Sequence, residues 1–253
     1  MARSIFGQRR KFSHGRLTEM DQPLGAKHAQ TFEAHEKALN EARNFHDWML
    51  RQHEDQDAIW FVNVLTALLR GLIIEYKRLN LGYQQSARLM AWACRNLMEI
   101  SIYTEYALKS EGNARELMED MLMDTLDIFT SFKKWFSALE PSMLTPELDA
   151  VVESFQETKH EAGISRKTYR TTRELAGILE REPDYLHANK VTSKLIHPTA
   201  WSLLSLNLDK NDAVMRPYIY QAGSKYYAES FLRIRKYVEK YGTKPIARAE
   251  QRI

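Results

Sequence analysis

The sequence has few of the residues that cross-link, bend or break a protein chain. Its 253 residues include one cysteine, Cys94, with ten glycines and seven prolines. A single cysteine excludes an intramolecular disulfide and an all-cysteine metal site, and it is typical of a reducing compartment. Because glycine and proline mark turns, their scarcity predicts few turns and long elements, which favours helices.

The sequence also predicts neither a targeting segment nor a membrane span. The basic N-terminus has no apolar run of signal-peptide length. The most apolar stretch, residues 58–76, carries Asn63, Arg70 and Glu75. Since a charge in mid-span is costly in lipid, a buried helix of a soluble protein is the better interpretation. We therefore expect no membrane contact and a cytoplasmic location.

Cofactor and metal motifs are lacking too. There is no phosphate-binding glycine loop and no dinucleotide fingerprint. Four histidines in the region of residues 28–53 lie seven, eleven and seven apart, whereas ligands on one helix need a spacing of three or four. The sequence therefore predicts no metal site and no cofactor.

What the chain does contain is helical periodicity. Hydrophobic residues make up 44% and charged residues 27%, which is ordinary globular usage. Apolar residues recur at intervals of three and four, and Thr145 before Pro146 is a strong helix start. We predict an all-α fold: one bundle of about seven to nine helices over residues 27–241, with basic tails at 1–26 and 242–253. Residues 201–208 could form a helical turn or a short strand.

Positive charge gathers at the two ends. Net charge is +3, but residues 1–20 hold five Arg or Lys against one acid, and residues 231–253 hold seven against two. Basic ends on an acidic body are compatible with binding to RNA or to an acidic protein partner, and equally with tails that only keep the chain soluble. The candidate nucleic-acid-binding residues on the last helix and tail are Arg233, Lys236, Lys240, Lys244 and Arg248.

Two pairs of polar residues are candidates for a site. Arg95 and Glu99 lie four apart within an apolar helix, so they share a face, and the pair could be a structural ion pair or part of a polar pocket that grips an anion. Ser193 and His197 also lie four apart, directly before Pro198. They could be a nucleophile and base, although no third residue orients the histidine, or a simple junction of elements. Convergence of the two pairs would favour a functional pocket.

Arg95-x-x-x-Glu99 together with Ser193-x-x-x-His197-Pro198 resembles an uncharacterised family of helical bacterial proteins, known only as a domain of unknown function. The similarity would cover residues 59–241. It implies an all-α bundle with a polar pocket and no established activity.

The predicted bundle also resembles HEPN domains, many of which cleave RNA. Their signature is an Arg and a His separated by four to six residues, acting across a dimer. Arg181-x5-His187 and Arg9-x4-His14 fit it, but eight His and 20 Arg in this length give roughly two matches by chance. The resemblance implies a metal-independent ribonuclease and a homodimer.

Three hypotheses for function follow. The first is a helical binding or regulatory protein, which by family analogy belongs to a bacterial stress or defence system. The second is the HEPN-like ribonuclease. The third is a nucleic-acid-binding module that uses the basic last helix.

Overall fold

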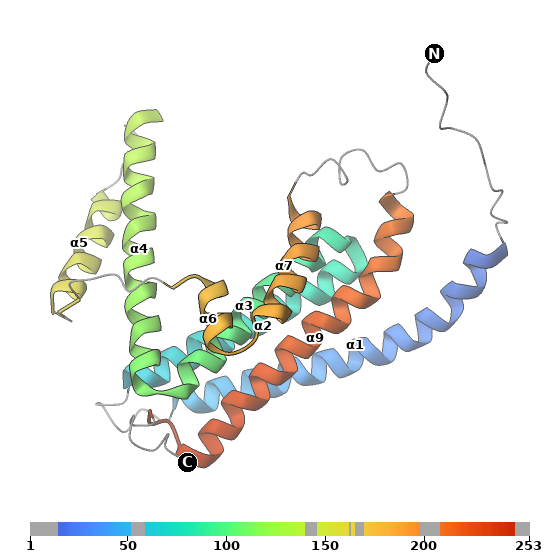
Figure 1. Ribbon diagram of the computed structural model, residues 1–253, viewed down its shortest axis with the longest axis horizontal. Coiled ribbons are helices and arrows are strands. Elements are labelled where there is room, and N and C mark those ends of the chain that lie inside the picture. Colours follow the sequence, from blue (N-terminus) through green and yellow to red (C-terminus); the bar gives the residue numbers. More distant parts are fainter. Residues whose placement is uncertain are drawn as a thin grey trace. The chain divides into compact units, whose positions relative to one another are not determined.

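The structure is a computed structural model that describes residues 15–51, 59–139, 146–161, 163–164, 170–197 and 208–245. Every regular element in these residues is a helix, which confirms the all-α prediction (Figure 1). The eight helices are α1 (Gly15–Leu50), α2 (Ile59–Gln85), α3 (Ala87–Lys109), α4 (Glu111–Leu139), α5 (Pro146–Glu161), α6 (Thr172–Ile178), α7 (Glu182–Ile196) and α9 (Leu208–Tyr241).

The chain divides into two compact units, residues 1–41 and residues 42–253. Helix α1 begins at Gly15, twelve residues before the predicted start at Lys27, so the helix includes part of the stretch that we expected to be a tail. The division falls inside α1. The second unit contains the other seven helices of the described chain.

Helix α3 is the centre of the second unit. It packs against α2, α4, α6, α7 and α9, and one broad face of it is buried. The fully enclosed apolar side chains of α3 include Met90, Leu97, Met98 and Ile102. Its partners bury Leu65, Leu69 and Leu72 from α2 and Ile234 from α9. Burial of such side chains, at roughly 2–3 kcal/mol each, provides most of the stabilisation of this unit.

The helix boundaries follow local chemistry. Ser86 separates α2 from α3 and accepts a hydrogen bond from the backbone N–H of Leu89, as an N-cap does. Thr171 and Glu174 form a complete capping box at the start of α6. Pro146 is the first residue of α5, as predicted. The segment that was open between strand and helical turn, residues 201–208, lies outside the described residues except for the first residue of α9.

Helices α4 and α5 form a hairpin that is only partly connected to the core. The first half of α4 packs on α3, and α5 contacts α4 along one flank. Phe129 stacks on Phe155 with ring centroids 6.1 Å apart, Val152 is buried beside them, and Lys133 pairs with Asp149. Only Ala114, Leu122 and Leu126 of α4 are buried, although the helix has 29 residues. Much of its apolar surface therefore has no cover.

One described helix, α2, is long and apolar enough to cross a membrane by length and composition alone. Of the most apolar 18-residue stretch of this helix, 56% is buried within the protein. A core helix has the same composition.

Candidate functional site

Arg95 and Glu99 form an ion pair along one side of α3. Arg95 Nε donates to Glu99 Oε1 at 3.0 Å, and the two side chains are 29% and 25% exposed. Trp92, one turn earlier, is 53% exposed, so this helix reaches water at that position although its sequence is apolar. The ion pair lies at the wetted edge of α3, where solvent weakens it, and it has the form of a local helix contact.

Ser193 and His197 are joined through the backbone. The His197 N–H donates to the Ser193 carbonyl at 3.1 Å and ends α7, while the Ser193 hydroxyl lies 3.2 Å from Asn189 Oδ1. The hydroxyl is thus committed to the preceding turn, and His197 is exposed. Helix α7 does pack on α3, but the Arg95–Glu99 ion pair includes neither Ser193 nor His197. The geometry gives the nucleophile–base hypothesis no support.

A polar cluster that joins three helices is centred on Glu105 of α3. Its carboxylate binds Arg181, which is the N-cap residue of α7, at 3.4 Å, and it also binds Arg233 of α9. Arg181 additionally donates to Asp184 at 3.0 Å. Asp184 accepts a hydrogen bond from the Tyr226 hydroxyl at 2.8 Å. Three helices are therefore held together by two guanidinium groups and two carboxylates.

Burial sets the ionisation of the neutral groups around this cluster. Desolvation, and secondarily the Asp184 charge, raises the pKa of the Cys94 thiol to about 12. The pKa of Tyr226 is raised for the same first cause and because its hydroxyl donates to Asp184. Both groups therefore stay protonated at neutral pH. With two positive and two negative groups in mutual contact, the cluster is balanced and suits a structural role.

These contacts bear on the Arg181-x5-His187 motif, because they engage its arginine. The Arg181 side chain is 14% exposed and is engaged by carboxylates, whereas His187 is exposed further along α7. An arginine neutralised in this way is poorly placed to grip a phosphate within one chain. The second match, Arg9 and His14, lies outside the described residues. The ribonuclease therefore stays a prediction without geometric support.

The basic face of α9 is only partly available. Arg233 is bound to Glu105, whereas Lys236 and Lys240 are exposed, with the Lys240 ammonium 4.8 Å from the ring centroid of Tyr241. Lys244 is exposed just after the helix ends, and its carbonyl accepts from Tyr237. Arg248 lies outside the described residues. Three lysines near a helix end are a weak electrostatic footprint for nucleic acid.

A second polar cluster joins α3, α4 and the segment before α6. The Tyr106 hydroxyl donates to Glu116 at 2.7 Å and accepts from Arg170 at 3.0 Å. Desolvation, together with the bond to Glu116, raises the pKa of Tyr106 to about 12. This cluster fixes the base of α4 on the core.

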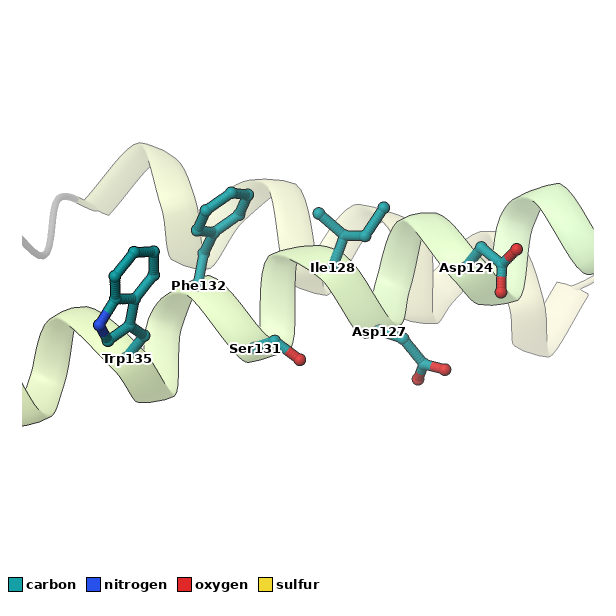
Figure 2. Close-up of a pocket in the computed structure, with 6 residues that line it drawn as sticks. All are labelled: Asp124, Asp127, Ile128, Ser131, Phe132 and Trp135. Carbon is teal, nitrogen blue, oxygen red and sulfur yellow. The ribbon is translucent and has the colours of Figure 1, made fainter. Parts of the chain in front are cut away.

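The surface that stands apart is the outer face of α4. Five large apolar side chains on it are between 41% and 63% exposed: Met121, Ile128, Phe132, Trp135 and Leu139. Figure 2 shows Ile128, Phe132 and Trp135 following one another along one edge of the helix, with Asp127 and Ser131 on the other edge. A shallow hollow of about 500 Å³ runs along these residues. Thr125 lies on the same face, and its hydroxyl donates back to the Met121 carbonyl at 2.8 Å. We call the six residues Met121, Thr125, Ile128, Phe132, Trp135 and Leu139 the α4 seam.

Sequence reasoning missed both Glu105 and the α4 seam. The apolar residues of the seam recur in the sequence at intervals of three and four. Periodicity shows that a helix has an apolar face but not what covers that face. Glu105 gave no signal, because its partners are 76 and 128 residues away along the chain.

Within the described residues, no group of three or more His, Cys, Asp or Glu side chains could hold a metal ion. Comparison of the chain with protein-family models, with curated proteins and with solved structures gives no match.

Proposed function

We propose that this protein is a helical binding protein, and that it engages another protein chain through the α4 seam. The observation that supports this function is the exposure of Met121, Ile128, Phe132, Trp135 and Leu139 on one face of one helix. Single exposed apolar residues are ordinary on protein surfaces, but five large ones on one face of one helix mark an interaction site.

The composition of the seam fits such a role. Aromatic residues and methionine are enriched where proteins meet, and tryptophan is prominent among the residues that dominate binding energy. Phe132, Trp135 and Phe136 form one aromatic group, with centroid separations between 5.6 and 6.5 Å. Helix α5 packs against α4 and supports it from one flank. A helix face laid against another helix or into a groove is a common mode of recognition.

Photo-crosslinking in living cells tests the proposal. Trp135→p-benzoylphenylalanine in the full chain is expected to give a discrete adduct with a protein, identified by mass spectrometry, and Ile128→Asp in the same chain is expected to remove it. Tyr218→p-benzoylphenylalanine is the matched control, because Tyr218 is an aromatic residue 72% exposed on another helix. Equal crosslinking at positions 135 and 218 would overturn the proposed function.

A further inference from the structure

We propose that the partner of the α4 seam is a second copy of this chain, packed in the antiparallel direction. This inference rests on the proposed function and names its partner. It is argued from the spacing of the seam, the size of its side chains and the distribution of charge along α4.

The spacing is that of a coiled-coil seam. Met121, Thr125, Ile128, Phe132, Trp135 and Leu139 follow at intervals of four, three, four, three and four residues. Alternation of three and four places side chains in one narrow stripe, which packs knobs into holes against another helix with the same stripe. The stripe is about 27 Å long at the helical rise of about 1.5 Å per residue. It differs from the flank of Leu122, Leu126 and Phe129, which faces α5 and the core.

The series of intervals reads the same in both directions, so the seam can pair with itself when one copy is turned end for end. A twofold axis near residue 130 then places Met121 opposite Leu139, Thr125 opposite Trp135, and Ile128 opposite Phe132. A small side chain faces the largest one, and an aliphatic side chain faces an aromatic one. In the parallel arrangement each residue would meet its own copy, so the indole of Trp135 would have to pack against a second indole. An isologous twofold contact of the first kind is the commonest form of homodimer.

Charge also favours the antiparallel direction. The first half of α4 is acidic and its second half is basic; the charged residues between positions 116 and 134 are Glu116, Glu119, Asp120, Asp124, Asp127, Lys133 and Lys134. End-for-end pairing about residue 130 brings Asp127 of one helix level with Lys133 and Lys134 of the other, keeps the acids of the two copies apart, and opposes the two helix dipoles. Parallel pairing would place five acids beside five acids.

Burial of the seam in a dimer leaves the one hydroxyl group among the six seam side chains with its hydrogen bond. The single polar member, Thr125, already donates its hydroxyl to the Met121 carbonyl, so its methyl group is what remains to enter the contact. Asp124, Asp127 and Ser131 lie along the rim of the hollow beside the apolar row, where charged groups can stay in water. Helix α5 lies on the other flank and does not cover the stripe.

Engineered cysteines distinguish the arrangements. We propose Met121→Cys and Leu139→Cys as separate full-length variants, one of them tagged, oxidised alone and as a mixture. In the antiparallel dimer the two copies of position 121 are about 27 Å apart, far beyond disulfide reach, whereas 121 and 139 of opposite copies are adjacent. The mixed disulfide is expected to exceed either self-linked dimer at least about tenfold. Cys94 stays in every variant, because it is buried.

The other outcomes contradict the inference. Equal self-linking of each variant alone would show parallel pairing. Linking no greater than that of the exposed control Tyr218→Cys would show that the seam does not meet a second copy. If crosslinking from position 135 then identifies a different protein, the proposed function stands and the homodimer fails. If crosslinking at position 135 also equals the control, both fail. Circular dichroism spectra that match the parent chain establish that the variants fold.

Discussion

At the scale of single residues, charge joins helices that are far apart in sequence. Glu105 contacts guanidinium groups from two other helices, and its side chain is 21% exposed. Arg95 and Glu99, by comparison, are four apart on one helix, with side chains 29% and 25% exposed. The physical difference is that Glu105 joins α3 to arginines of two other helices, one of which, Arg181, is 14% exposed, whereas Glu99 pairs with an arginine of its own helix.

This contrast gives a paired prediction for stability. Glu105→Gln is expected to lower the free energy of unfolding by about 1–3 kcal/mol, because the charges of Arg181 and Arg233 lose compensation. Glu99→Gln on the same helix is expected to lower it by less than about 1 kcal/mol. Urea denaturation of both variants measures the difference. Equal losses would show that Glu105 is no more important to the fold than the local pair.

The buried thiol gives a prediction that depends on pH. Desolvation raises the pKa of Cys94 from 9.0 to about 12, and the residue is 3% exposed. Because the folded pKa is the higher one, this group favours folding fully below pH 9, and the contribution is lost as pH rises toward 12. At pH 8 we expect the native chain to react with a thiol reagent at least about a hundredfold more slowly than the urea-unfolded chain. Reaction at the unfolded rate in native buffer would contradict the burial.

At the scale of elements, two glycines have opposite expected effects. A Cβ at Gly82 would lie 2.8 Å from the backbone nitrogen of Met90, since the end of α2 and the start of α3 approach closely there. A Cβ at Gly177 in α6 would meet nothing within 4 Å. Gly82→Ala is therefore expected to destabilise the protein by about 1–3 kcal/mol, and Gly177→Ala to stabilise it by about 0.5–1 kcal/mol.

Thermal melting of both variants checks this pair. The structural account requires shifts of opposite sign, so a rise in melting temperature for both would mean that α2 and α3 do not meet closely at Gly82.

Gly82 also shows where sequence reasoning about elements reaches its limit. Because glycine commonly ends helices, its residue type alone predicts a helix end near this position. In the structure α2 continues to Gln85, and the missing side chain serves close helix approach instead. Helix identity was predictable because apolar period and capping residues such as Pro146 are local signals. Helix neighbours, and hence the Glu105 cluster, were not, since pairing depends on contacts far apart in sequence.

At the scale of the whole molecule, the same limit applies to function. The predicted residues Arg181 and Arg233 do meet, but they meet on Glu105, and neither is left free to serve as the separate phosphate-binding group that the sequence suggested. The feature with most functional content is instead a surface, the α4 seam, whose six side chains are recognisable as exposed only when the core has been assigned to other helices. Because the seam is complementary to itself, we propose that this surface holds two copies of the chain together.

Sedimentation equilibrium of the purified full-length chain tests this claim most directly. The account predicts that the mean mass rises with concentration from one chain toward two, and that Phe132→Glu holds it at one chain, while Tyr218→Glu, at an exposed position away from the seam, behaves as the parent. A chain that remains at the mass of one copy across the accessible concentrations, or a dimer that Phe132→Glu leaves intact, would contradict it.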